Sequence, residues 1–329
     1  MLFQNAKHPV EMKVTHLNKV KAQRKQQLQL QMVNDKGLTS LISRAFTDLT
    51  KKDNPKKTSK FSLFKNKPAN KNCFVLDFHG DIKATEVQQL REEISTLLTV
   101  AQAEDEVIVC LESSGGMVHA YGLAAAQLAR IKEAGLHLTV CIDKVAASGG
   151  YMMACVADKI LAAPFAVVGS IGVVAQVPNF HDLLEKHDID VEVFTAGKYK
   201  RTVTVFGENT EEDKQKFQQE LEETHKLFKD FVRKYRPNLD VEQVATGEHW
   251  YGEDAITRNL VDALQTSDSY ILEKMTDSEL YAIQSRQKPT IAQKLGILQA
   301  AQAVVATAID KLPDALVKLE SAKMPMVKK

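Results

Sequence analysis

Two glycine pairs in the sequence each lie between an apolar run of strand length and a helical pattern. The first pair, Gly115-Gly116, follows the run Val107–Leu111. Glycine permits positive φ angles, and backbone N–H groups at the start of a helix can stabilise an oxyanion. A tight turn between a strand and a helix explains the pair equally well, so the pair alone does not identify a reaction.

Ser148 precedes the second pair, Gly149-Gly150, and follows the apolar run Leu138–Ile142. A serine at such a turn is sterically open and lies at the positive end of the following helix dipole, where a nucleophile is favoured. A helix cap is the simpler interpretation of Ser148. Because Ala146 replaces the first glycine, the segment does not match the G-x-S-x-G turn of α/β-hydrolases.

A serine nucleophile needs a base, and histidine and lysine are the candidates. His119 is the histidine closest in sequence to the glycine pairs. Four others have polar surroundings, in which a surface role is usual: His181, His187, His225 and His249. A lysine can accept a proton only if burial lowers its pKa from about 10.4 toward neutrality. Lys200 follows the apolar run Val191–Phe194, which favours burial, whereas the S-x-x-K match at Ser285–Lys288 lies in a polar stretch and is interpreted as a coincidence.

Alternating strands and helices must position these residues. The strand-length apolar runs are Cys73–Phe78, Val107–Leu111, Leu138–Ile142, Ile160–Ala162 and Val191–Phe194. The helical patterns are Ala84–Val100, Met117–Ala134 and Thr210–Tyr235, the last beginning with a Thr210/Asp213 capping pair. Almost continuously apolar strands that alternate with helices are typical of an α/β domain with a largely parallel sheet.

The near-zero net charge of the 329-residue chain conceals two oppositely charged parts. Residues 1–71 have 16 basic and 4 acidic side chains, a net charge of +12, and the remainder has 27 basic and 38 acidic side chains, a net charge of −11. We therefore expect a basic arm at 1–71, an α/β domain at 72–266, and a polar linker with a helical tail at 267–329. The arm fits a solvated linker with a fraying helix, or a segment that binds anionic lipid or nucleic acid.

No apolar run reaches the roughly 18 to 20 residues of a membrane-spanning helix, and the first residues lack the apolar region of a signal peptide. The nearest candidate, Ile291–Ile309, contains Lys294 and predicts an amphipathic or core-covering helix, with a membrane surface as the alternative. The four cysteines lie in apolar runs without metal-ligand spacing, which predicts buried thiols: Cys73, Cys110, Cys141 and Cys155.

Four segments, in this order along the chain, resemble the serine peptidases of the signal peptide peptidase A family, and in particular its SohB-like branch. They are DKVAASGGYMMACVADKI (Asp143–Ile160), GSIGVVAQ (Gly169–Gln176), TAGKYKRT (Thr195–Thr202) and ATGEHWYG (Ala245–Gly252). The similarity extends over roughly residues 73–264. It implies a ClpP/crotonase-like α/β fold with a mostly parallel sheet and flanking helices.

The resemblance also implies a role for individual residues. Ser148 corresponds to the nucleophile and Lys200, rather than Lys198, to the general base. The implied oxyanion hole consists of Gly115, Gly116 and the N–H group of Gly149. Ser170 corresponds to a supporting hydroxyl that holds the lysine. No metal or cofactor is implied. The family resemblance further implies a ring-like homo-oligomer, in which one subunit can supply the lysine to the serine of its neighbour.

Three departures from the family pattern are visible. Ser114 stands where the family commonly has proline, and Asn259 stands where it usually has glycine, although asparagine also tolerates the left-handed conformation. The N-terminal membrane span of SohB-like proteins has no counterpart in this sequence, so either the start is truncated or the protein is attached in another way.

We expect association with the inner membrane, and the sequence leaves open on which side of it the catalytic domain lies. A basic flank normally stays cytoplasmic, whereas the family's quality-control role is assigned to the periplasmic face.

The sequence therefore predicts a serine endopeptidase with a Ser148/Lys200 dyad. Its expected substrates are signal-peptide remnants or other membrane-associated polypeptides, and no nucleic-acid partner is expected. Two alternatives stay open at this stage. One is a crotonase-like enzyme that binds an acyl-CoA thioester in the same oxyanion hole, and the other is a non-catalytic membrane-surface scaffold whose basic arm is the functional part.

Overall fold

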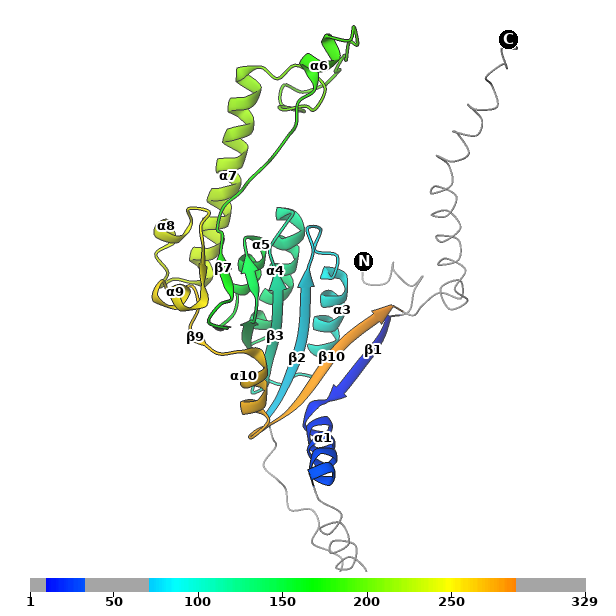
Figure 1. The fold of residues 1–329 in the computed structure, drawn as a ribbon, viewed down its shortest axis with the longest axis vertical. Coiled ribbons are helices and arrows are strands. Elements are labelled where there is room, and N and C mark those ends of the chain that lie inside the picture. Colours follow the sequence, from blue (N-terminus) through cyan, green and yellow to red (C-terminus); the bar gives the residue numbers. More distant parts are fainter. Residues whose placement is uncertain (1–9, 33–70, 288–329) are drawn as a thin grey trace, which may run out of the picture. The chain divides into compact units, whose positions relative to one another are not determined.

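A mostly parallel sheet organises the computed structural model, which describes residues 10–32 and 71–287 (Figure 1). Its main strands lie in the order β1-β10-β2-β3-β4-β6-β9, and β5, β7 and β8 continue the sheet from β3. The strands are β1 (Val10–His16), β2 (Lys71–Gly80), β3 (Glu106–Ser113), β4 (His137–Ile142), β5 (Val145–Ala147), β6 (Lys159–Ala162), β7 (Val167–Gly169), β8 (His249–Tyr251), β9 (Ala263–Leu264) and β10 (Ser278–Gln287). The α/β fold with a mostly parallel sheet is thus as the sequence predicts.

The helices are α1 (Leu17–Met32), α3 (Val87–Leu97), α4 (Val118–Glu133), α5 (Gly149–Ala154), α6 (His181–Glu185), α7 (Glu211–Tyr235), α8 (Val241–Val244), α9 (Gly252–Thr257) and α10 (Ser267–Lys274). Helices α3, α4 and α5 pack on one face of the sheet and α10 on the other, whereas α6 lies away from the sheet (Figure 1). Leu76 and Phe78 of β2 belong to the large core under α3, α4 and α5, while Val75 belongs to a smaller cluster with Tyr270 of α10. Successive side chains of a strand point to opposite faces, so the two clusters lie on opposite sides of the sheet.

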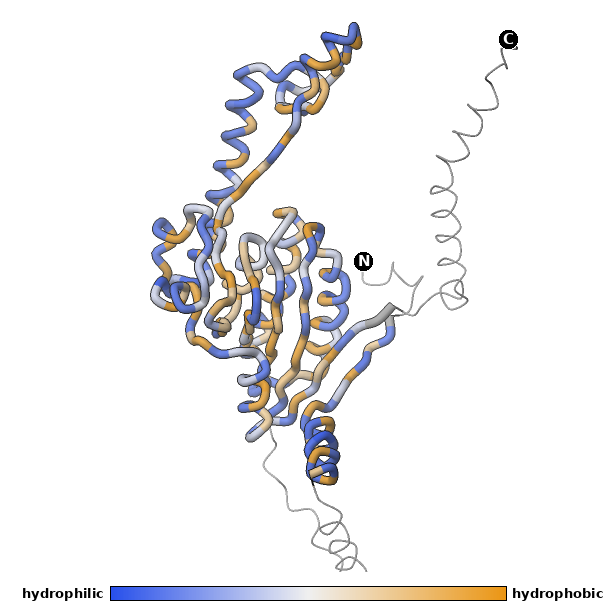
Figure 2. Tube along the Cα trace, in the orientation of Figure 1, coloured by the Kyte–Doolittle hydropathy of each residue, from blue (hydrophilic) through white to orange (hydrophobic). Residues whose placement is uncertain are grey.

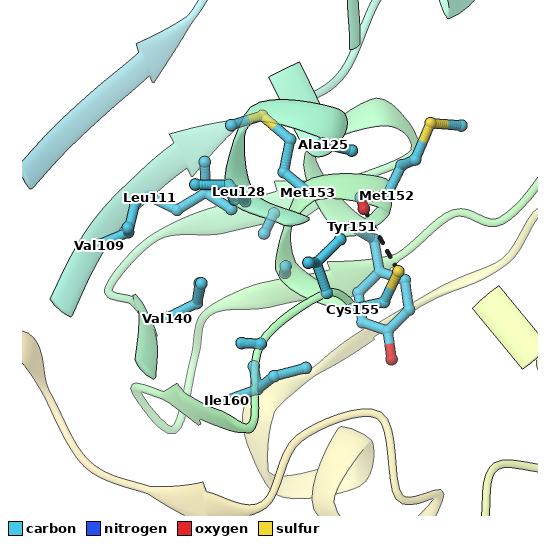
Figure 3. Close-up of a cluster of buried hydrophobic side chains, with 14 of the residues drawn as sticks. Val109, Leu111, Ala125, Leu128, Val140, Tyr151, Met152, Met153, Cys155 and Ile160 are labelled. Atoms are coloured by element: carbon cyan, nitrogen blue, oxygen red, sulfur yellow. Dashed lines mark hydrogen bonds between the residues drawn. The ribbon is translucent and has the colours of Figure 1, made fainter. Parts of the chain in front are cut away.

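The large core fixes α5 against the central strands. Figure 2 shows apolar residues concentrated along these strands, and Figure 3 shows side chains of β3, α4 and α5 converging. Val109, Leu128 and Met153 are fully buried there. The four cysteines are free thiols; Cys73, Cys141 and Cys155 are buried as predicted, whereas Cys110 is only half-buried.

The predicted capping pair of α7 is present. Thr210 Oγ1 accepts a hydrogen bond from the N–H group of Asp213 (3.2 Å), and Asp213 Oδ2 accepts one from the N–H group of Thr210 (3.0 Å). The capping box therefore fixes where the long helix begins.

The strand predicted at Val191–Phe194 is wrong. The structure has no regular element at these residues, and Phe194 is 87% exposed. The chain leaves the sheet after β7 and runs out to α6 (Figure 1). Without a neighbouring strand to pair with, an apolar run cannot satisfy its backbone groups as a strand.

Two strands come from segments in which the sequence analysis expects linkers. Ser278–Ala282 of β10 pairs in parallel with Lys71–Val75 of β2, and β1 pairs with β10. Leu280 and Ile283 of β10 are buried. The sheet thus includes residues from outside the range 72–266. The predicted helix at Ile291–Ile309 lies outside the described residues.

Within residues 10–32 and 71–287, none of the helices combines the length and the apolar character needed to span a membrane.

Candidate active site

Ser148 is held in an uncommon backbone conformation between β5 and α5. Its φ and ψ angles are 51° and −119°, and positive φ is rare outside glycine. The N–H group of Ser148 donates to the carbonyl of Gly169 (2.8 Å), which ties the turn to β7. The Ser148 side chain makes no capping hydrogen bond to α5. The helix-cap interpretation therefore fails, and the half-buried hydroxyl is available for another role.

The first glycine pair lies against this turn. Gly115 has φ +88°, and a Cβ atom built on it would lie 2.6 Å from the nitrogen of Gly149 and 2.8 Å from Cβ of Ser148. Such distances leave no room for a side chain, so glycine is required at this position. The structure thus brings together Ser148 and both glycine turns.

The hydrogen bonds of the first turn decide which N–H groups are available. Gly115 N–H donates to Ser113 Oγ (3.0 Å), and Met117 N–H donates to the carbonyl of Ile82 (2.8 Å). No hydrogen bond of the described residues uses Gly116 N–H. Gly149 is the first residue of α5, so its N–H group has no partner within the helix. Of the three predicted oxyanion donors, Gly116 and Gly149 remain available, and the N–H group of Gly115 is already engaged.

A pocket of about 270 Å³ opens beside Ser148. Its walls come from the first glycine turn, α4, α5, the segment after β7, and α7. The lining residues are Gly116, Val118, Gly122, Ser148, Gly149, Met152, Gly172, Val173, Thr224, Leu227, Phe228 and Phe231. Most of these side chains are apolar, so the pocket suits an apolar group attached to whatever Ser148 attacks.

Ser170 lies near the serine turn but does not line this pocket. It has φ 52°, and its N–H group donates to the carbonyl of Glu248 (2.6 Å). The preceding residue, Gly169, accepts the hydrogen bond from Ser148 N–H. Ser148 and Ser170 are therefore both held at the end of β7.

Lys200 is not brought to Ser148 within one chain. Its side chain is exposed, and it belongs to the segment between α6 and α7. This segment lies at the end of α7 away from the sheet (Figure 1). The burial that the sequence analysis expects for Lys200 is absent from the single chain. The neighbouring Lys198 pairs with Glu212 (2.9 Å), and this hydrogen bond raises the pKa of Lys198.

The other candidate bases are also absent from the pocket lining. His119 is exposed near the start of α4. His225 of α7 is half-buried, with Nε2 3.2 Å from the carbonyl of Ile171. Ser285, the serine of the S-x-x-K match, lies on β10, and it is 5% exposed although the sequence analysis expects no burial. Ser285 does not line the pocket beside Ser148, and Lys288 lies outside the described residues.

The fold and this site define a class of protein: an α/β protein with a serine on a strand-to-helix turn, free N–H donors beside it, and an apolar pocket. Residues 130–281 match the model of Peptidase family S49, and residues 2–128 match that of Peptidase family S49 N-terminal. The chain belongs to peptidase family S49.

Curated relatives and solved structures add detail. The chain is 64% identical over 223 residues to a protein of Haemophilus influenzae described as Probable protease SohB, covering 68% of this chain and 63% of that protein. It is 56% identical over 224 residues to a protein of the same description from Buchnera aphidicola subsp. Acyrthosiphon pisum, covering 68% of this chain and 67% of that protein. A solved structure of the 1510-N membrane-bound stomatin-specific protease aligns with a TM-score of 0.42 at 12% identity, covering 65% of this chain and 98% of that one.

Proposed function

We propose that this protein is a serine endopeptidase in which Ser148 is the nucleophile and Lys200 the general base. The observation that carries the proposal is the contact between the two glycine turns, beside which Ser148, Gly116 and Gly149 line one pocket. Membership of peptidase family S49 supports the reaction class.

The proposed reaction proceeds through an acyl-enzyme. Neutral Lys200 Nζ takes the proton of Ser148 Oγ as this oxygen attacks the carbonyl carbon of a peptide bond. The N–H groups of Gly116 and Gly149 donate to the resulting oxyanion. The lysine then gives its proton to the departing amine as the C–N bond breaks, and water activated by the same lysine releases the acyl group. These steps use no metal ion or cofactor.

In this proposal Lys200 comes from a neighbouring copy of the chain in a homo-oligomer. Its exposed position at the far end of α7 supports this arrangement, because a base for Ser148 must be within hydrogen-bond reach. The same segment exposes apolar side chains that an interface would cover, among them Phe194 (87% exposed) and Phe206 (52% exposed). Contact with the neighbour would also supply the burial that lowers the pKa of a lysine.

The pocket beside Ser148 supports polypeptides with apolar side chains as substrates, which fits signal-peptide remnants and other membrane-associated polypeptides. Association with the inner membrane is part of the same proposal, and the basic character of residues 1–71 supports it through attraction to anionic lipid.

Labelling with a fluorophosphonate probe and hydrolysis of an apolar peptide test the proposal. Ser148→Ala and Lys200→Ala are expected to abolish both, with folding retained. Lys198→Ala is the matched control, because this lysine is two residues away and already pairs with Glu212. Full activity of purified Lys200→Ala would exclude the dyad and direct attention to His119. A wild-type protein that hydrolyses an acyl-CoA thioester without labelling at Ser148 would support the crotonase-like alternative.

Coexpression of differently tagged Ser148→Ala and Lys200→Ala chains tests whether the site is shared. Mixed oligomers contain pairs with an intact serine and an intact lysine, so activity should return if the lysine comes from the neighbour. Inactivity of every mixed oligomer would show that the two residues must belong to one chain.

A further inference from the structure

A buried tyrosine contacts residues that hold the two free N–H groups, those of Gly116 and Gly149, in place. Tyr121 of α4 is fully buried. A Cβ atom on Gly149 would lie 2.4 Å from Cγ of Tyr121, so the tyrosine ring lies directly against the first residue of α5. The same ring carries a hydroxyl that reaches toward the other glycine turn.

The hydroxyl belongs to a chain of hydrogen bonds that ends on this turn. Tyr121 O–H donates to the carbonyl of Asp81 (2.7 Å). With the tyrosine proton on the carbonyl of Asp81, Ser113 Oγ is the donor in its 2.5 Å contact with Tyr121 Oη, and this bond is shorter than the alternative from Ser113 Oγ to the carbonyl of Gly80 (3.4 Å). Ser113 Oγ then accepts from Gly115 N–H (3.0 Å). The donors therefore all point one way, from Gly115 through Ser113 and Tyr121 to Asp81.

This chain of hydrogen bonds fixes one side of the turn that contains Gly116. It holds the peptide between residues 114 and 115, while Met117 N–H is held by the carbonyl of Ile82 (2.8 Å). Gly116, between these two fixed points, is left with its N–H group free and lines the pocket. A Cβ atom on Gly116 would lie 2.2 Å from the carbonyl oxygen of Ile82, so the turn is pressed against the loop that follows β2.

The loop after β2, whose carbonyl groups accept the hydrogen bonds from Tyr121 and Met117, is itself held by hydrogen bonds. Asp81 Oδ1 accepts from the N–H groups of Lys83 (3.1 Å) and Thr85 (2.8 Å), and Asp81 Oδ2 accepts from Thr85 Oγ1 (3.0 Å). Burial raises the pKa of Tyr121, so its hydroxyl remains a donor at neutral pH. Ser113 is 2% exposed and Tyr121 is fully buried, so water has little access to replace either hydroxyl.

We propose that Tyr121 is a positioning residue for both oxyanion donors. Its ring sets the place of Gly149 N–H, and its hydroxyl, through Ser113 and Gly115, sets the place of Gly116 N–H. The inference rests on the proposed peptidase activity, because it assigns these N–H groups to the oxyanion. Displacement of such a donor weakens an interaction made in the transition state, so kcat rather than KM should change.

Tyr121→Phe tests the hydroxyl while keeping the ring. We expect kcat for a peptide and the rate of fluorophosphonate labelling at Ser148 each to fall about 10-fold, with KM unchanged, since loss of a complete donor costs about 100-fold to 1,000-fold. Ser113→Ala should have the same effect. The double variant should lose no more than either single variant, because the two hydroxyls act as one chain.

Tyr270→Phe is the matched control. Tyr270 is also a buried tyrosine (3% exposed) with a hydrogen-bonded hydroxyl, which donates to Glu106 (2.6 Å), but it lies on the opposite face of the sheet. This variant should lose thermal stability and keep its kcat. Equal kcat values for Tyr121→Phe and Tyr270→Phe would overturn the positioning role.

Amide hydrogen exchange of the segment 113–117 separates this proposal from the proposed function. Exchange at Gly115 should be faster in Tyr121→Phe than in the wild type and unchanged in Tyr270→Phe. If the wild type is not labelled at Ser148, the peptidase proposal is wrong and the positioning role is lost with it. If the wild type is labelled and Tyr121→Phe is labelled equally fast, only the positioning role is wrong.

Discussion

The α-carbon of Gly115 faces the amide nitrogen of Gly149 so closely that a Cβ atom at position 115 would lie 2.6 Å from that nitrogen. The two residues follow neighbouring strands, since Ser113 at the end of β3 pairs with Ala146 of β5. The contact is therefore produced by the parallel pairing, which brings the carboxyl ends of two strands to the same edge of the sheet.

The variant Gly115→Ala is expected to lose at least about 100-fold in kcat, because its methyl group would displace or cover the Gly149 N–H group. It should also lose about 1 to 2 kcal/mol of unfolding free energy, since alanine is strained at φ +88°. Steady-state kinetics and urea unfolding measure the two effects.

Gly135→Ala is the control for backbone strain. Gly135 ends α4 with φ +79°, and a Cβ atom there meets no atom within 4 Å. Gly135→Ala introduces the backbone strain without the close contacts, so it should be destabilised less than Gly115→Ala and remain fully active. If both variants keep wild-type kcat, the contact between the turns has no part in the reaction.

Gly122 leaves space in the pocket beside Ser148, because a Cβ atom on it would meet nothing within 4 Å. Gly122→Leu should fill part of the 270 Å³ and lower kcat/KM most for peptides with large apolar side chains. Gly122→Ala should change the specificity little and raise the unfolding free energy by about 0.5 to 1 kcal/mol, because glycine is unfavourable inside a helix. Comparison of a small and a large apolar substrate provides the measurement. An equal loss for both substrates would show that this pocket does not select side chains.

Local signals in the sequence were sufficient for much of this site. The turn that carries Ser148 lies between a strand and a helix as predicted, because the apolar run before it and the glycines after it are adjacent in sequence. The start of α7 was predictable for the same reason, since Thr210 and Asp213 form the cap by themselves. Asn259 adopts φ 60°, as expected of a residue that replaces glycine at a helix end.

Features that depend on distant residues were not predictable. The strand β10 is polar at many positions, and only its pairing with β2 makes it a strand. The apolar run before Lys200 suggested burial, but the chain projects this segment away from the sheet. No pattern in the sequence marked Tyr121, because its importance comes from contacts with Ser113 and Gly149 that form only in the fold.

The burial of Glu93 predicts that the stability of the protein depends on pH. This residue of α3 is 5% exposed, and its Oε1 accepts a hydrogen bond from Ser285 N–H (2.6 Å). Burial, with smaller contributions from Glu86 and Asp77, raises the pKa of Glu93 above 4.5. The carboxyl group of Glu93 therefore keeps its proton to a higher pH in the folded state than in the unfolded state. The contribution of Glu93 to the stability of the folded protein is fully present below about pH 4.5 and is lost as the pH rises through the folded-state pKa.

Glu93→Gln should remove this dependence and be more stable than the wild type at pH 8. The amide oxygen can still accept from Ser285 N–H, and its NH₂ group can donate to Ser285 Oγ, a buried oxygen with no hydrogen-bond partner among the described residues. Thermal unfolding of both proteins between pH 4 and pH 8 checks the sign. A difference in melting temperature that stays constant over this range would exclude Glu93 as the titrating group.

Arg236 fixes the base of α7, the helix that forms one wall of the pocket. Its guanidinium donates to both carboxylate oxygens of Asp262 (3.0 and 2.8 Å) and to the carbonyl of Asn259 (2.9 Å). Asp262 also accepts from Ile160 N–H (2.7 Å), so the pair connects α7 with β6. The side chains of Arg236 and Asp262 are 11% and 35% exposed, which makes this a partly buried pair.

Arg236→Ala should lower the unfolding free energy by about 2 to 3 kcal/mol, because it leaves Asp262 without its partner in a partly buried position. Arg236→Lys should recover little, since an ammonium cannot make the two parallel bonds. Arg233→Ala is the control. Arg233 is 49% exposed and pairs with Asp230 and Glu242 at the surface, where such pairs contribute about 0 to 1 kcal/mol. In urea unfolding, Arg233→Ala should have nearly the same free energy of unfolding as the wild type, and both Arg236 variants should have a clearly lower one. Equal losses at positions 233 and 236 would show that the buried pair does not hold α7 in place.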